Sequence, residues 1–264
     1  MNKTLNKRAL VSFDGVCPIN CKHCYTYQMD NISKERTANE IVESLISSEF
    51  DVIYLSQKKE NFINQKAGVE LCNKLYNRYK KDLFVITRIA LNDNTLVELK
   101  KLSVQMANDG NTFYLAVSIP CLDFYGITET RGNIATPQER IDCLKRANKI
   151  GLHTILMARP LYPNRIIPIG DVLNLINLCK DYIECVVSSG VAVNKKILEQ
   201  LGMSHEKFDY LKENEYLVGA IPCKLDYVDV RKEMKMISEY CDLLDLPYFD
   251  HSLKALNYIK SKIE

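Results

Sequence analysis

Short runs of consecutive apolar residues alternate with longer amphipathic stretches along most of the chain. The apolar runs predict strands at 10–13, 52–55, 83–87, 113–118, 153–157 and 185–187. The amphipathic stretches predict helices near 38–48, 67–80, 95–107, 137–150 and 171–181. Strands and helices that alternate at this spacing are typical of a parallel sheet covered by helices.

One of the predicted helices carries clear start and stop signals. Thr136 and Pro137, followed by Glu139, predict the beginning of a helix, and Gly151 predicts its end. The strand segments are continuously apolar rather than alternating, which is expected when both faces of a sheet are covered.

The six predicted strand–helix units indicate an α/β fold, a partial (β/α)6 TIM-type barrel, because a complete barrel has eight such units. The pattern changes after Val193, where the sequence becomes mixed and helical in tendency. We interpret residues 1–193 as the barrel and residues 194–264 as a C-terminal helical cap packed on it, so that the chain forms one domain.

Composition narrows the class of protein. The chain has 264 residues, 47% of them apolar, and can bury a core without disulfide bonds. Its 35 Lys and Arg residues against 33 Asp and Glu leave a net charge of +2, which does not favour nucleic acid as a partner. No apolar run approaches the ~18 residues of a membrane-spanning helix, and the N-terminal segment lacks the apolar run of a signal peptide. We therefore expect a cytoplasmic protein without a membrane partner.

Three of the ten cysteines lie within eight residues, directly after the first predicted strand. Cys17, Cys21 and Cys24 form a C-x3-C-x2-C run, whose spacing lets one loop wrap three thiolates around a single inorganic centre. A four-iron cluster held by three thiolates leaves one iron open to a substrate or cofactor. A zinc site is the alternative, and it needs a fourth ligand such as His23. Three unrelated core cysteines would instead fall on periodic apolar positions, which this loop does not offer.

The cysteine loop and the strand–helix alternation together resemble the radical S-adenosylmethionine (SAM) superfamily over about residues 8–190. The resemblance implies a [4Fe-4S] cluster on Cys17, Cys21 and Cys24, with SAM chelated at the open iron. It also implies that one electron, from an external donor such as flavodoxin or ferredoxin, cleaves SAM to a 5′-deoxyadenosyl radical, which abstracts hydrogen from the substrate. The chain departs from the family in having His23 where an aromatic residue usually precedes the third cysteine.

The rest of a SAM pocket is expected at the C-terminal ends of the strands. Ser56 and Gln57 follow the second strand, where the family has a Gly-Gly-Glu-like segment that meets the SAM amino group. Arg88 is expected to pair with the SAM carboxylate, and Ser118 to bond its ribose or carboxylate. The alternatives are an ordinary salt bridge for Arg88 and a small strand-ending residue before Pro120 for Ser118.

Further residues resemble the branch of the superfamily that contains spore photoproduct lyase. Glu129 is expected to pair with Arg140, which lies on the proline-led helix, so that the two order the barrel mouth and belong to the cofactor pocket. The alternative for Arg140 is that, with Glu139, it is only the charged first turn of that helix. Arg159 is expected to hold an anionic substrate or the SAM carboxylate, and Met157 to line the adenine pocket unless it is plain core. Cys121, just beyond the fourth strand, is either a hydrogen donor to a product radical or a loop thiol without a chemical role.

The sequence thus predicts a radical SAM enzyme, and the absence of a basic stripe favours a small or short-chain substrate. One alternative is an enzyme that acts on nucleic-acid or nucleotide lesions, as in the spore photoproduct lyase branch. Another, from a different class, is a non-catalytic zinc-binding module that uses the three cysteines and His23.

Overall fold

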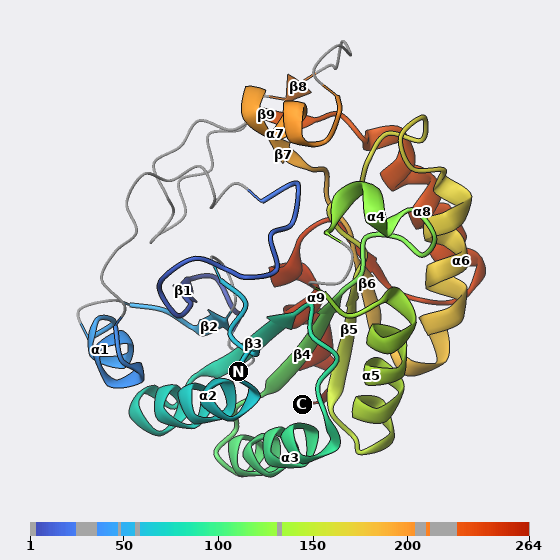
Figure 1. Cartoon of the computed structure of the whole chain (residues 1–264). Coiled ribbons are helices and arrows are strands. Elements are labelled where there is room, and N and C mark those ends of the chain that lie inside the picture. The colour runs from blue at the N-terminus through green and yellow to red at the C-terminus, as the bar shows by residue number, and fades with distance from the viewer. Residues whose placement is uncertain are drawn as a thin grey trace.

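A computed structural model of the chain describes residues 4–24, 36–46, 49–55, 59–130, 134–203, 210–211 and 226–263. One parallel sheet of seven strands, in the order β1-β2-β3-β4-β5-β6-β10, forms the centre of the fold (Figure 1). Its strands are β1 (Arg8–Val11), β2 (Val52–Leu55), β3 (Asp82–Thr87), β4 (Phe113–Ser118), β5 (His153–Met157), β6 (Cys185–Val187) and β10 (Tyr248–Phe249). A small antiparallel sheet adds β7 (Ala192–Val193), β8 (Tyr210–Leu211) and β9 (Asp226–Val228).

The described helices follow the strands in alternation through most of the chain. They are α1 (Ala38–Glu43), α2 (Gln65–Tyr79), α3 (Asp93–Asn108), α4 (Tyr125–Thr128), α5 (Pro137–Lys149), α6 (Ile169–Cys179), the 3-10 turn η2 (Lys180–Tyr182), α7 (Lys195–Gln200), α8 (Arg231–Leu243) and α9 (Ser252–Ile263). This arrangement confirms the predicted α/β fold, which is like a partial TIM barrel. None of the described helices is long and apolar enough to cross a membrane.

Helix α5 begins with the N-terminal cap that the sequence predicts. The Thr136 hydroxyl accepts a hydrogen bond from the Glu139 backbone N–H at 3.3 Å, and the Glu139 carboxylate accepts from the Thr136 N–H at 2.7 Å. Pro137 occupies the first turn, where its missing N–H costs nothing. Gly151 follows the helix with a φ of +77°, a conformation that glycine adopts without strain.

Two strand predictions need correction. The first strand covers 8–11 rather than 10–13, because its pairing with β2 begins at Arg8 and Val52. The sheet also has a seventh strand, β10, which pairs in parallel with β6. The sequence pattern did not predict β10, because two residues give no periodic signal and their partners lie far away in the chain. The segment interpreted as a helical cap therefore contributes a strand to the main sheet and two to the small one.

Alternate side chains of the strands pack into two separate cores. Ile53 and Leu55 face the outer helices, whereas Val52 and Tyr54 belong to a second cluster on the other face of the sheet. The second cluster includes Ala255, Leu256 and Ile259, all from α9. The C-terminal helix thus covers the inner face of the curved sheet, opposite α2, α3, α5 and α6.

Polar contacts fix α9 at that position. The Lys260 ammonium lies 2.8 Å from a carboxylate oxygen of Asp82, the buried first residue of β3. The Asn257 side chain accepts from the Leu5 N–H at 2.8 Å and donates to the Leu5 carbonyl at 3.1 Å. Asp82 also accepts from the Thr112 N–H at 3.1 Å, so its charge is well compensated.

Replacing Lys260 with alanine should lower the free energy of unfolding by about 3 kcal/mol, because the Asp82 charge would remain buried without its cation. Chemical denaturation followed by circular dichroism measures this change. The matched control is Lys254→Ala, which removes an exposed ion pair with Asp250 and should cost at most about 0.5 kcal/mol. Equal losses in both variants would contradict the role assigned to Lys260.

Candidate functional site

The three clustered cysteines lie on the loop that leaves the C-terminal end of β1. All three are free thiols; Cys21 is buried, and Cys17 and Cys24 are half-buried. Together with Ile19 and Ile134 they form a small apolar cluster of their own. The loop therefore gathers the three thiols in one partly covered place above the edge of the sheet.

The backbone of this loop is held by the segment that follows β4. The Lys22 N–H donates to the Thr128 carbonyl at 3.0 Å, and the His23 Nδ1 lies 3.1 Å from the same oxygen. The Cys24 N–H donates to the Cys21 carbonyl at 3.0 Å, which closes a turn between two of the cysteines. Asn20 adopts a left-handed φ of +55°, which asparagine tolerates better than most residues.

His23 is a neutral imidazole in this setting. A carbonyl oxygen only accepts hydrogen bonds, so the contact with Thr128 requires the proton on Nδ1. Burial lowers the pKa of His23 well below its ordinary value, and the nearby Arg88 guanidinium lowers it further. Nε2 is therefore the nitrogen with a free lone pair, and the zinc alternative would have to use it.

The donor set fits a thiolate-bound metal centre. Burial raises the pKa of Cys21 to about 12, while the positive charge of Arg88 acts in the opposite direction. Ligation to a metal replaces the proton of a thiol, so a high pKa in the metal-free protein is compatible with a ligand role. No three His, Cys, Asp or Glu side chains among the described residues are grouped tightly enough to hold a metal ion. The fit therefore rests on the ligand chemistry and on the single loop that carries all three thiols.

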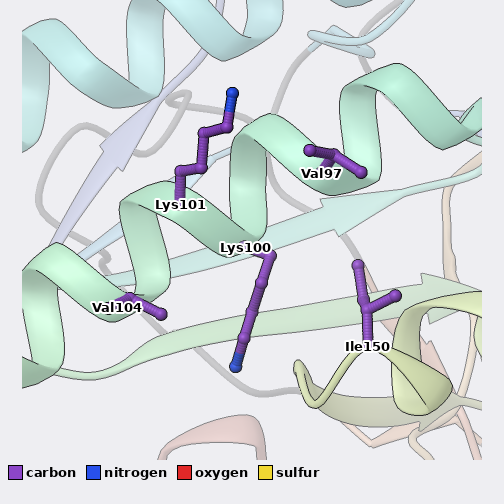
Figure 2. A pocket seen from close by; sticks show the side chains of 5 residues that line it. All are labelled: Val97, Lys100, Lys101, Val104 and Ile150. Atoms are coloured by element: carbon purple, nitrogen blue, oxygen red, sulfur yellow. The ribbon is translucent and has the colours of Figure 1, made fainter.

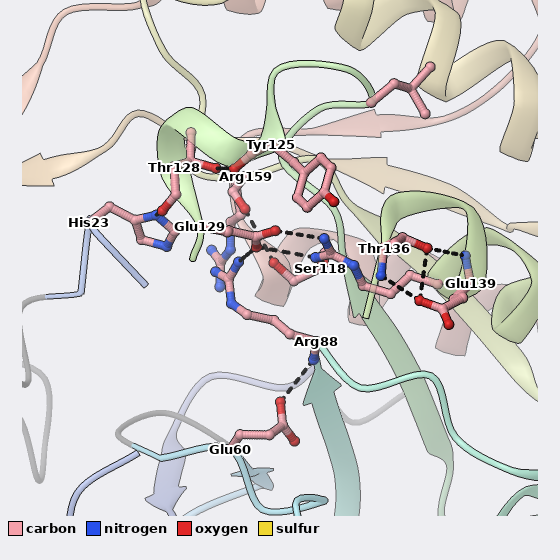
Figure 3. Close-up of polar contacts among 12 residues, drawn as sticks. His23, Glu60, Arg88, Ser118, Tyr125, Thr128, Glu129, Thr136, Glu139 and Arg159 are labelled. Atoms are coloured by element: carbon pink, nitrogen blue, oxygen red, sulfur yellow. Dashed lines mark hydrogen bonds and ion pairs between the residues drawn. The ribbon is translucent and has the colours of Figure 1, made fainter. Parts of the chain in front are cut away.

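A buried ion network lies beside the cysteine loop (Figure 3). The Glu129 carboxylate has no exposed surface and accepts from Arg88 Nη1 at 2.7 Å and from Arg140 Nη2 at 2.6 Å. Arg140 is also fully buried and donates from Nη1 to the Ser118 carbonyl at 2.6 Å. The pair predicted between Glu129 and Arg140 is present, and it links the end of β4 to α5.

Glu60 is a second buried carboxylate at this site, and the sequence analysis gave it no role. One of its oxygens accepts from the Arg88 N–H at 2.8 Å, and the other accepts from Thr87 and Phe62, each at 3.0 Å. Burial raises its pKa, and these hydrogen bonds oppose that effect. A usable signal was present, since Glu60 is the only acid between β2 and α2. Glu60 fixes the backbone of Arg88 through this hydrogen bond, while Glu129 holds the Arg88 side chain.

Tyr162 is a further residue that the sequence analysis missed. It is fully buried, and its hydroxyl has no hydrogen-bond partner in the described part of the chain. Arg88, Cys121 and Glu129 are close enough to influence its pKa, which burial raises well above the ordinary value. The only sequence signal was its place in the loop after β5. An unpartnered hydroxyl beside an ion network suits contact with a bound ligand.

The remaining predicted residues fall into three groups. The Ser118 hydroxyl donates to the Arg159 carbonyl at 3.2 Å, so the ends of β4 and β5 are joined at the edge near the loop. Met157 and Cys121 are completely buried, and burial raises the pKa of the Cys121 thiol. Ser56 and Gln57 lie outside the described residues. For all of these, and for the enclosed Glu129 and Arg140, contact with a cofactor stays a prediction.

A hollow of about 490 Å³ lies elsewhere, on the outer layer of helices (Figure 2). It is lined by Val97, Lys100, Lys101 and Val104 of α3 and by Ile150 after α5. Lys100 donates to the Gly151 carbonyl at 2.8 Å, and Lys101 pairs with Glu98 at 2.6 Å. No acid, hydroxyl or thiol lines this hollow, and both of its lysines are already engaged, so the chemistry-bearing residues are those around the cysteine loop.

Comparison with solved structures identifies the fold. A cysteine-to-serine mutant of spore photoproduct lyase matches with a TM-score of 0.59 and 12% identity, over 90% of this chain and 75% of that one. Streptococcus suis SuiB bound to S-adenosylmethionine matches with a TM-score of 0.60 and 12% identity, over 94% of this chain and 51% of SuiB. A spore photoproduct lyase mutant with bound AdoMet and dinucleoside spore photoproduct matches with a TM-score of 0.57 and 11% identity, over 92% and 76%.

Both proteins are radical SAM enzymes, so the chain has the partial-barrel fold of that superfamily. The predicted resemblance is confirmed at the level of the fold. No protein-family model matches the sequence, and no curated protein does.

The neutral state of His23 makes stability depend on pH. Below the ordinary histidine pKa of about 6.5 the unfolded chain binds a proton that the folded chain does not, so folding stability falls as the pH is lowered. For the metal-free protein this contribution is lost progressively as the pH falls below about 6.5. His23→Asn keeps a donor at the Nδ1 position and should show a correspondingly smaller fall, measured by urea denaturation above and below about pH 6.5. An NMR titration in which the His23 ring protonates near pH 6.5 would refute the assignment.

Proposed function

We propose that this chain is a radical SAM enzyme that holds a [4Fe-4S] cluster on Cys17, Cys21 and Cys24. The observation that carries the proposal is the position of these thiols, on one loop at the C-terminal edge of a barrel shared with SAM-bound SuiB. Parallel barrels build their active sites at that edge. When bound, the cluster would supply the electron that cleaves SAM to a 5′-deoxyadenosyl radical, which takes hydrogen from the substrate.

The residues around the loop would prepare this site in three ways. Thr128 holds the loop through the Lys22 backbone and the His23 ring, the two residues that lie between Cys21 and Cys24. Arg88 brings a positive charge close to Cys21, which offsets the negative charge that thiolate ligands introduce. Ile134 and Ile19 cover the thiols with apolar surface and limit access of water.

Arg88 and Ser118 are the residues of this chain best suited to bind SAM. Within the described residues, Glu129 engages Nη1 of Arg88, while Nε and Nη2 donate to no other side chain. A planar guanidinium with two donors to spare matches a carboxylate. Arg159, Met157, Ser56 and Gln57 complete the proposed pocket, and Glu129 and Arg140 position it from behind.

The substrate we propose is small or short-chain, and the electron comes from an external donor such as flavodoxin or ferredoxin. Structural neighbours of the same fold differ in this respect, since one was solved with a dinucleoside spore photoproduct and another with a precursor peptide. The fold therefore does not decide the substrate. The first of these neighbours favours a second candidate function, repair or modification of nucleic-acid lesions. Fluorescence anisotropy with labelled DNA and RNA at ~150 mM salt separates the two, because submicromolar binding would favour the second.

Alanine in place of Cys17, Cys21 or Cys24 should abolish the brown absorbance of protein reconstituted anaerobically with iron and sulfide, together with all SAM cleavage. Wild-type protein reconstituted in the same way should contain about four irons per chain. Iron analysis and detection of 5′-deoxyadenosine by chromatography measure both effects. A colourless protein with one zinc per chain would support the zinc module instead.

Cys72 and Cys143 provide matched controls, because both are fully buried in the core of the outer helices. Their alanine variants should keep the iron content of the wild type and lose stability on the order of 1 kcal/mol. Full iron content in any variant of the loop cysteines would disprove the ligand assignment.

Arg88→Ala and Ser118→Ala should retain the cluster but bind SAM more weakly, by about tenfold for a lost charge-assisted contact. Arg88→Lys should also weaken binding, because an ammonium does not reproduce a two-pronged contact with a carboxylate. Isothermal titration of the reconstituted variants with SAM measures these affinities. Wild-type affinity in both alanine variants would leave Arg88 as a salt-bridge residue and Ser118 as a strand end.

A further inference from the structure

A group of polar side chains lies on the inner face of the sheet, apart from the cysteine loop. The Tyr54 hydroxyl is 3.1 Å from the hydroxyl of Ser252, the first residue of α9. The Arg8 guanidinium lies 5.4 Å from the centre of the Tyr54 ring, and its Nη1 is 3.2 Å from His251 Nε2. We call Arg8, Tyr54, His251 and Ser252 the inner polar cluster. It brings together β1, β2 and the beginning of α9.

The inner polar cluster has more hydrogen-bond donors than acceptors. The Leu253 N–H points at His251 Nδ1 at 3.2 Å, and Arg8 points at Nε2. A neutral imidazole accepts at only one of its two nitrogens, so His251 satisfies at most one of these two donors in either tautomer. Tyr54 and Ser252 use a single hydrogen between them, which leaves a further hydroxyl hydrogen available. An acceptor with several lone pairs would satisfy this surplus.

Arg8 differs from other arginines of the chain in its electrostatic surroundings. Six described arginines lie within salt-bridge distance of a carboxylate: Arg36, Arg78, Arg88, Arg140, Arg146 and Arg231. Arg8 has no carboxylate partner among the described residues, although it is only half-exposed. A half-buried guanidinium without a counter-ion is costly, so a negative charge supplied by a ligand would stabilise it.

Neighbouring groups add to the positive potential of the inner polar cluster. Arg159 is close enough to lower the pKa of Tyr54, as Arg8 does. The cluster also lies at the N-terminus of α9, a twelve-residue helix whose dipole favours negative charge there. The nearest acid in the sequence, Asp250, is paired with Lys254 at 2.7 Å.

The position of the cluster relates it to the candidate active site. Tyr54 is the penultimate residue of β2, and Ser252 follows the end of β10, so both are near the C-terminal edge of the sheet, from which the cysteine loop extends. Arg8 is the first residue of β1, and its guanidinium lies over the Tyr54 ring. A ligand bound on the inner face near this edge of the sheet would extend toward the cysteine loop.

We infer that the inner polar cluster binds an oxyanion, a phosphate or carboxylate group, on the inner face of the barrel. That this group belongs to the substrate rests on the proposed function; the binding site itself rests only on the contacts given above. The substrate class is then a small anionic molecule, with its charged end at Arg8 and His251 and its reactive part directed toward the cysteine loop.

Titration of the full-length protein with inorganic phosphate, and separately with acetate, tests the inference by isothermal calorimetry. No iron or SAM is added, so the result is independent of whether the chain is a radical SAM enzyme. At least one of the two anions should bind saturably, and the one that binds more tightly identifies the oxyanion. Arg8→Gln should weaken that binding by about tenfold, the effect of losing one charge-assisted contact.

Arg78→Gln is the matched control, because Arg78 also lies over a tyrosine ring, at 5.7 Å, but on the outer helix α2. It should bind the anion as the wild type does. Saturable binding of neither anion, or equal affinities in wild type and Arg8→Gln, would overturn the inference. Equal weakening in Arg78→Gln would do the same, since it would show binding to scattered surface charge. If circular dichroism shows that Arg8→Gln does not fold, His251→Ala replaces it in the same titrations, with the same expected and contradicting results.

Discussion

The buried carboxylate of Glu129 is the contact on which the candidate site depends. It joins Arg88 at the end of β3 to Arg140 of α5, and both partners lie within 2.7 Å. Removing three charges from water is expensive, and such a network persists only when geometry and hydrogen bonds are nearly complete. The residue before Glu129 is Thr128, whose carbonyl holds the backbone of Lys22 and the ring of His23. The position of the cysteine loop thus follows from the position of one buried charge.

The same network sets the electrostatics of the loop. Two guanidiniums share one carboxylate, and Arg88 extends its influence to Cys21 and His23. Burial and that positive charge together keep the imidazole neutral, and at Cys21 the charge opposes the effect of burial, so it would make a centre bound by three thiolates less costly to bury. Glu60 holds the backbone of Arg88 in place, because its carboxylate accepts a hydrogen bond from the Arg88 N–H and from two further donors. Arg88 therefore belongs to the buried ion network and also sets the charge around the cysteine loop.

Features with a local signal were predictable from the sequence. The strands are continuous apolar runs, α5 has its capping residues, and the cysteine spacing is explicit. The pairing of Glu129 with Arg140 was also expected. Tyr162 was not, because its role arises from partners that are distant in sequence. Glu60 had a signal in its position as the only acid between β2 and α2, but its contact with Arg88 did not follow from that position. The strand β10 has two residues, and the pairing that makes it a strand comes from β6. An amphipathic pattern likewise does not tell which face of a sheet a helix covers, so the sequence placed α9 in a C-terminal cap without assigning it to the inner face.

The location of α9 limits where a ligand can approach. Its apolar side packs against inward-facing residues of β2 to β6, among them Tyr114 and Ile155, and Lys260 fixes its end to the beginning of β3. The inner face toward the N-terminal ends of the strands is therefore filled by protein. The proposed ligand would therefore approach from the C-terminal edge of the sheet, where the cysteine loop and the inner polar cluster lie. Under the proposed function, a helix that fills the barrel from within favours a compact substrate, and the charge of Arg8 near the N-terminus of α9 favours an anionic one.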